Sequence, residues 1–121
     1  MYDQILRTPD LVMISMERDE YTAHPASETV SVKDIQVTTA LKSDGLHVML
    51  TALATPVRVI RLRWKTQLPT DVRILGDAWE RTYGDAGWSG MVPYRAMPWY
   101  FLVQNGENVA GYGVKVKAGA M

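Results

Sequence analysis

Residues 35–54 read IQVTTALKSDGLHVMLTALA, and this stretch carries the clearest structural pattern in the chain. Apolar and polar side chains alternate from Ile35 to Leu41, which is the period of a β-strand with one buried face. Ser43-Asp44-Gly45 then supplies turn residues, and Asp-Gly accepts the positive φ angles that tight hairpin turns need. We therefore expect a β-hairpin whose second strand runs from Leu46 to Ala54.

The second strand of this hairpin has apolar side chains on both faces. Val48, Leu50 and Ala52 share one face, and Met49 and Leu53 share the other. Strands that are covered on both sides have this composition. We expect the strand to be packed on both faces.

Within residues 57–66, VRVIRLRWKT, apolar and cationic side chains alternate from Ile60 to Lys65. The apolar set is Ile60, Leu62 and Trp64, and the cationic set is Arg61, Arg63 and Lys65. Period-two alternation predicts a half-buried strand. The cationic face is interpreted as a solvated sheet face, with a subunit boundary as the alternative.

Further strands are predicted on both sides of this region, and no segment has a convincing helical period. Seven or so short strands separated by glycine and proline predict an all-β fold, an antiparallel β-sandwich of supersandwich-like type. We expect residues 1–121 to form a single sandwich domain or a fragment of a larger β domain, because the chain ends at residues 117–121 directly after a strand. The further strands are 11–16, 29–32, 72–75, 99–104 and 109–116.

Charge and composition exclude several classes of function. Lys plus Arg and Asp plus Glu number 13 each, so the chain lacks the basic footprint of a nucleic-acid binder and any strong attraction to anionic membranes. It has no cysteine, and His24 and His47 are isolated, so neither a metal site nor a cofactor is predicted. No signal peptide or membrane span is recognisable, and a cytoplasmic protein is expected.

Residues 76–101, GDAWERTYGDAGWSGMVPYRAMPWYF, hold seven of the eleven aromatic residues of the chain, together with carboxylates and arginines. A connection of this length is usually functional or disordered, and its aromatic content argues against disorder. The segment is therefore predicted to be a binding surface. Its candidate binding residues are Asp77, Trp79, Glu80, Arg81, Tyr83, Asp85, Trp88 and Trp99.

Carbohydrate is the ligand that this mixture of side chains matches best. The C–H faces of sugar rings pack on aromatic rings, while carboxylates and guanidinium groups bond the hydroxyls. The alternative is that the tryptophans are core residues and the charges pair locally. Asp77, Glu80 and Asp85 could supply glycosidase carboxylates only at defined separations, which sequence spacing does not fix, so no catalytic residue is assigned. Gly111 and Gly113 lie inside a strand pattern and predict a bulge or a close backbone approach.

The residues at 62–88, LRWKTQLPTDVRILGDAWERTYGDAGW, followed by PYRAMPWYF and GYGVKVK, resemble the N-terminal β-sandwich domain of melibiase-like α-galactosidases, glycoside hydrolase family 36 and its relatives. The resemblance covers roughly residues 57–117, and GDAWERTYGD at 76–85 is its most specific part. In that family a catalytic barrel carries the aspartates and follows the sandwich. The resemblance implies that Asp77, Trp79, Glu80 and Trp88 lie toward the barrel or its sugar pocket.

The departures from the family limit what the resemblance implies. The barrel is absent from these residues, and the N-terminal sandwich of the family is much longer than this chain. The expected function is a non-catalytic domain that packs on the barrel of the same protein and contributes contacts to a galactoside-like sugar. The alternatives are a stand-alone carbohydrate-binding module and a structural or oligomerising sandwich, which includes a homo-oligomer.

Overall fold

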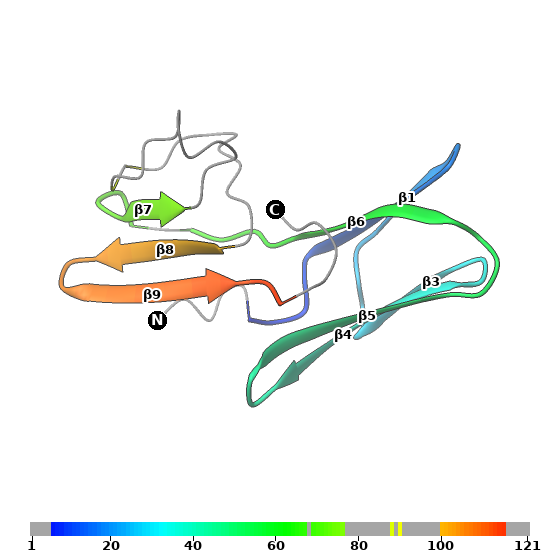
Figure 1. Cartoon of the computed structure of the whole chain (residues 1–121), viewed down its shortest axis with the longest axis horizontal. Coiled ribbons are helices and arrows are strands. Elements are labelled where there is room, and N and C mark those ends of the chain that lie inside the picture. The colour runs from blue at the N-terminus through cyan, green and yellow to red at the C-terminus, as the bar shows by residue number, and fades with distance from the viewer. Residues whose placement is uncertain (1–5, 68, 77–87, 89, 91–99, 116–121) are drawn as a thin grey trace. The chain divides into compact units, whose positions relative to one another are not determined.

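The computed structural model describes residues 6–67, 69–76, 88, 90 and 100–115, and all regular structure within them is β-strand (Figure 1). The all-β fold predicted from the sequence is confirmed, and every strand pair is antiparallel. The strands are β1 (Leu11–Met16), β2 (Glu20–Ala23), β3 (Thr29–Val32), β4 (Ile35–Lys42), β5 (Gly45–Ala52), β6 (Val57–Arg63), β7 (Arg73–Gly76), β8 (Tyr100–Asn105) and β9 (Asn108–Gly113).

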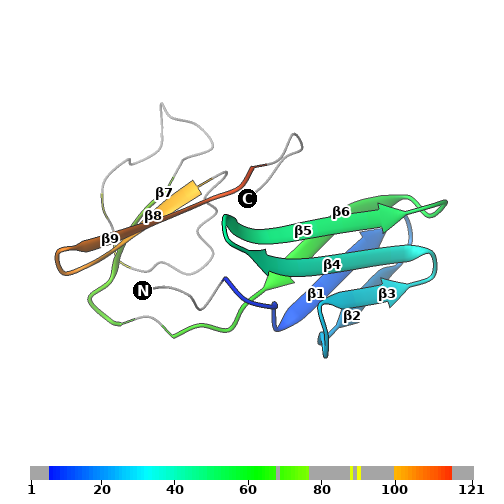
Figure 2. The same ribbon diagram turned by 90° about the horizontal axis from the view of Figure 1, so that it is seen from below.

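The chain divides into two compact units, residues 2–66 and residues 67–121. The first, which we call the sandwich unit, contains two three-stranded sheets of order β2-β1-β6 and β3-β4-β5. Figure 2 shows these two sheets facing each other. The second, which we call the sheet unit, contains one three-stranded sheet of order β7-β8-β9.

The core of the sandwich unit lies between its two sheets. Along β1 every second residue is buried, and Val12, Ile14 and Met16 form one inward stripe. Ile35 and Val37 of β4 bury the facing stripe, each at 1% exposure or less. Burying one such side chain stabilises a fold by about 1.5–3 kcal/mol. The alternating sequence of these strands therefore accounts for the layered structure.

The predicted hairpin is confirmed in both its strands and its turn. β4 and β5 pair in unbroken register from Ile35 opposite Ala52 to Lys42 opposite Gly45. Gly45 adopts a φ angle of 137°, a backbone conformation that residues other than glycine rarely adopt.

The expectation that β5 is packed on both faces is wrong. Val48 and Leu50 lie on the inward face, opposite Thr39 and Val37, yet they are 38% and 44% exposed. Met49 on the outward face is 62% exposed. β5 is the edge strand of its sheet. The inward residues of β4 are buried, whereas no residue of β5 is fully buried.

β6 alternates as its sequence predicts. Ile60 and Leu62 pack against the core, whereas Arg61 and Arg63 are exposed. The apolar residues of this strand therefore extend the buried face of the β2-β1-β6 sheet, and Arg61 and Arg63 meet solvent.

β2 is a strand that the sequence analysis missed. It pairs with β1, and the turn between them is closed by the Met16 N–H, which donates to the Asp19 carbonyl at 2.8 Å. Only Ala23 of this strand packs on the core, so the strand has almost no apolar alternation. Tyr21 and Thr22 are residues with high β propensity and were the available signal.

Asp34 joins two turns of the sandwich unit. Its carboxylate accepts hydrogen bonds from the backbone N–H groups of Ala54 and Thr55, the latter at 3.0 Å, and from the Thr55 hydroxyl. These bonds, the hydroxyl bond first, hold the pKa of Asp34 far below its ordinary value. The β3–β4 turn is thereby fixed to the segment that leads into β6.

Candidate functional site

Trp88 is the one predicted binding residue that the structure describes, and its side chain is 37% exposed. This exposure is compatible with a binding role but does not test one. The other seven lie outside the described residues, and their assignment stays a prediction; they are Asp77, Trp79, Glu80, Arg81, Tyr83, Asp85 and Trp99.

The two ends of the aromatic segment are held side by side by the sheet unit. β7 ends at Gly76, and β8 begins at Tyr100. Gly76 and Phe101 are direct partners in the antiparallel pairing of β7 with β8. The two residues of this pair flank the aromatic segment in the sequence, so its two attachment points are one strand spacing apart.

The two faces of the sheet in the sheet unit differ in burial, and the more exposed one, which we call the open face, still half-buries Leu75, Leu102 and Gln104. Ile74 and Val103 are opposite each other on the buried face, at 7% and 2% exposure. Side chains alternate along a strand, and partners in register share a face, so the neighbouring residues form the open face. Its members are Arg73 and Leu75 of β7, Tyr100, Leu102 and Gln104 of β8, and Val109, Gly111 and Gly113 of β9.

Tyr100 is the aromatic side chain of the open face and is 41% exposed. Its partner in β9 is Gly113, which has no side chain to cover the ring. One pair further along, Leu102 lies opposite Gly111. A Cβ atom at Gly111 would lie 3.0 Å from Leu102 Cδ2, so a leucine side chain fills the space beside this glycine. The predicted bulge is absent from the β8–β9 pairing, which is in unbroken register, and the predicted close backbone approach is not what the structure shows there.

The far end of the open face is polar. Arg73 and Gln104 are cross-strand partners, and with Asp71 and Gly106 they line an open hollow of about 320 Å³. The Gln104 side-chain amide donates to the Gly106 carbonyl at 3.2 Å, which ties two of these residues together. A guanidinium, a carboxylate and an amide thus border one small space, and together they can donate and accept hydrogen bonds.

The buried face of the same sheet carries a second aromatic feature. The rings of Phe101 and Tyr112 stack at a centroid distance of 5.1 Å and an interplanar angle of 26°. Offset-stacked pairs of this kind add about 0.5–1.5 kcal/mol beyond the area they bury. Phe101 is also the residue paired with Gly76, so the stack lies next to the pair that flanks the aromatic segment in the sequence.

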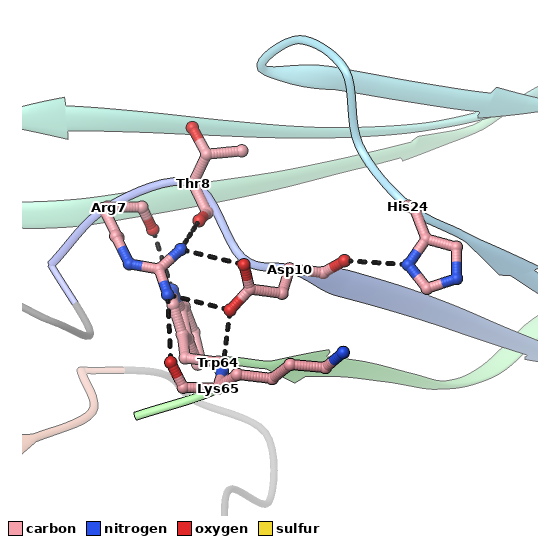
Figure 3. Close-up of polar contacts among 6 residues, drawn as sticks. All are labelled: Arg7, Thr8, Asp10, His24, Trp64 and Lys65. Atoms are coloured by element: carbon pink, nitrogen blue, oxygen red, sulfur yellow. Dashed lines mark hydrogen bonds and ion pairs between the residues drawn. The ribbon is translucent and has the colours of Figure 1, made fainter. Parts of the chain in front are cut away.

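The sandwich unit contains a separate polar cluster around Asp10 (Figure 3). Arg7 donates from both terminal nitrogens to the Asp10 carboxylate, at 2.8 and 3.2 Å, and the Lys65 N–H donates to it at 2.7 Å. The Arg7 hydrogen bond, followed by that of Lys65, lowers the pKa of Asp10 to about 2. Trp64 Nε1 donates to the Arg7 carbonyl at 2.8 Å. The cluster joins the chain before β1 to the end of β6.

His24 belongs to the edge of this cluster and has a structural contact. Its Nδ1 lies 3.2 Å from the Asp10 carbonyl oxygen, and because a carbonyl only accepts, Nδ1 carries the proton. His47 Nε2 lies 2.7 Å from Asp44 Oδ1 in the β4–β5 turn. No group of three or more His, Cys, Asp or Glu side chains placed to hold a metal ion occurs in the described part of the chain.

No family model, curated protein or solved structure matches this chain. Among the described residues, no helix has the length and apolar character needed to cross a membrane.

Proposed function

We propose that this chain is a non-catalytic β domain of an α-galactosidase-like glycoside hydrolase, and that its sheet unit forms one side of a sugar site. The open face of β7, β8 and β9 and the segment of residues 77–99 would contact the sugar together. A catalytic barrel of the same protein would supply the reacting carboxylates.

The observation that carries this proposal is the exposed Tyr100 ring on the same face as a polar hollow. Tyr100 and Gln104 are four residues apart on β8 and point to the same side. At the usual rise of a strand, roughly 13 Å separate them, so a ligand of more than one sugar ring would reach both. On the neighbouring strand β9, Gly111 and Gly113 have no side chains that would project above the open face beside Tyr100 and Leu102.

Sugar chemistry fits both ends of this face. The C–H side of a pyranose packs on an aromatic ring, which supplies a large apolar surface with few rotatable bonds. Its hydroxyls need donors and acceptors together, and the guanidinium of Arg73 and the amide of Gln104 supply them beside the carboxylate of Asp71. A site built in this way rejects analogues that lack a hydroxyl, because its polar groups would be left unpaired.

The sequence resemblance supports the more specific part of the proposal. The three strands of the sheet unit and the aromatic segment all fall within residues 57–117, the range that resembles the N-terminal domain of melibiase-like α-galactosidases. The sugar is therefore proposed to be a galactoside.

Calorimetric titration with methyl α-galactoside and a galactose-containing oligosaccharide tests the proposal. We expect weak binding of the oligosaccharide by the wild-type chain and a loss of about tenfold in affinity for Tyr100→Ala, which corresponds to about 1.4 kcal/mol. Tyr21→Ala is the matched control, because Tyr21 is exposed to a similar degree, 37%, but lies on β2. Binding that is unchanged in Tyr100→Ala would contradict the proposed face.

The same titration separates the alternative of a stand-alone carbohydrate-binding module. A module would bind sugar by itself with the same affinity that it shows beside any catalytic partner. A domain that forms one side of a shared site would bind measurably tighter once the barrel is joined to it. Equal affinity in both forms would favour the module.

A further inference from the structure

β5 has an unusual edge among the strands that the structure describes. It is eight residues long, it pairs with β4 on one side, and no described strand pairs with its other side. Strand edges of this length present a row of backbone donors and acceptors to other chains, and proteins normally protect them with charges, proline or bulges.

Such protection is missing from β5. Between Gly45 and Ala54 the chain has no Lys, Arg, Asp, Glu or Pro. Its apolar side chains are exposed on both faces, with Val48 and Leu50 inward and Met49 outward. An edge of this kind favours association over solvation.

The other sheet edges of the described chain differ from β5. β6 carries Arg58, Arg61 and Arg63, so pairing of two β6 strands would bring like charges together. β2, β3 and β7 are four residues long, and β9 has six residues of which two are glycines. Length and lack of charge therefore single out β5.

The sequence of β5 is also complementary to itself. In an antiparallel pair centred on Met49, Val48 of one strand lies opposite Leu50 of the other, and Leu46 lies opposite Ala52. His47 then lies opposite Thr51, and Met49 lies opposite its own copy. Apolar residues meet apolar residues on the inward face, and no like charges meet within the strand.

We propose that two copies of this chain associate through antiparallel pairing of β5 with β5, about a two-fold axis at Met49. The sheet β3-β4-β5 then continues into its symmetry mate as one six-stranded sheet. Val48 and Leu50, which the facing sheet leaves exposed, are covered by the same residues of the second copy. An interface of this type is isologous, as expected of a closed dimer. The proposal is independent of sugar binding by the sheet unit.

The first test measures the mass of the full chain in solution by light scattering, at concentrations from roughly 1 to 100 μM, where modest interfaces dissociate. We expect the wild-type chain to reach twice the mass of one copy. Met49→Lys places two like charges on the axis and should weaken the dimer at least tenfold. Thr22→Lys adds the same charge to exposed β2 and should leave the dimer intact. A wild-type monomer throughout, or a Met49→Lys dimer of unchanged strength, would overturn the proposal.

The second test fixes the register by cysteine cross-linking, which the cysteine-free chain makes unambiguous. Met49→Cys brings two thiols directly opposite each other, at the Cβ separation of about 4.5–5.5 Å typical of cross-strand partners. Thr51→Cys is the matched control on the same face, because its two copies would lie roughly 13 Å apart along the strands. Mild oxidation should join two Met49→Cys chains and leave Thr51→Cys chains single. Equal cross-linking of both variants, or of neither, would refute the two-fold axis at Met49.

Discussion

The sandwich unit and the sheet unit differ in how many faces of their strands are covered by other residues. In the sandwich unit, two sheets bury their alternating stripes against each other, and Ile14 and Ile35 are fully buried between them. In the sheet unit, one face is buried at Ile74 and Val103, while the other exposes Tyr100 beside two glycines. Strict alternation on facing sheets produces a buried core, whereas the glycines opposite and beside Tyr100 leave its ring exposed.

The polar groups of the two units differ in the same way. In the sandwich unit, Asp10 and Asp34 each accept several hydrogen bonds from the protein itself. In the sheet unit, Asp71 and Arg73 border an open hollow. The carboxylates of Asp10 and Asp34 thus tie chain segments of the sandwich unit together, whereas Asp71 lies beside an open hollow.

The largest effect is expected from Ile14→Ala in the core of the sandwich unit. The side chain is fully buried, so its removal leaves a cavity and should lower the free energy of unfolding by about 2–5 kcal/mol. Urea denaturation followed by circular dichroism measures this loss. Thr22→Ala, on exposed β2, is the control and should change stability by less than about 0.5 kcal/mol. A loss no greater than that of the control would show that the sandwich core is not what stabilises this unit.

A smaller loss of stability is expected from Asp34→Ala, which removes the acceptor for two N–H groups and one hydroxyl. The melting temperature should fall less than in Ile14→Ala but clearly more than in Asp19→Ala. Asp19 is a suitable control because its carboxylate has one long, exposed ion pair, at 3.6 Å from Lys33. Equal melting temperatures for the two aspartate variants would mean that the Asp34 contacts do not stabilise the turns.

Acid should abolish the contribution of Asp10 at a defined pH. Its pKa in the folded chain is about 2, below the ordinary 3.8 that it regains on unfolding. The folded state therefore gains stability that is complete above about pH 4 and is lost as the pH falls toward 2. Unfolding of the wild-type chain and of Asp10→Asn, measured across this range, should differ at neutral pH and converge near pH 2. A constant difference would contradict the lowered pKa.

The smallest effect is expected from Gly111→Ala on the open face of the sheet unit. The new Cβ would lie 3.0 Å from Leu102 Cδ2, so the leucine must shift by a few tenths of an ångström. We expect stability to change by no more than about 1 kcal/mol. In the double variant with Leu102→Ala the two effects should not add, because the residues are in contact. Additive effects would indicate that this close approach is unimportant.

Alternation allowed most of the fold to be predicted from the sequence. The β4–β5 hairpin and the two faces of β6 follow from residue order, because burial repeats every second residue in a strand. β2 was missed because it is held by pairing with β1 rather than by burial. The burial of β5 was predicted wrongly because β5 lies at the edge of its sheet. The order of strands in a sheet cannot be inferred from the residues of one strand alone.

The candidate site could be predicted only in part. The aromatic density of residues 76–101 predicts a binding segment, and that assignment stays a prediction; the structure adds that Gly76 and Phe101, at its two ends, are paired. The open face with Tyr100, Arg73 and Gln104 was not predicted, because its members come from different strands and meet only through register. The signal that pointed toward it was the pair of glycines in β9.

The pairing of Gly76 with Phe101 has a consequence for engineering and for divergence of the sequence. The segment between them starts and finishes one strand spacing apart, roughly 4.8 Å. The entropy of closing a loop grows only logarithmically with its length, so doubling the segment would cost about 0.6 kcal/mol. Segments of other lengths and compositions can therefore be grafted between these two residues at little cost to the sheet. The pairing of β7 with β8 thus sets a fixed anchor for inserted segments, and the length between the two strands can be changed without redesigning the strands themselves.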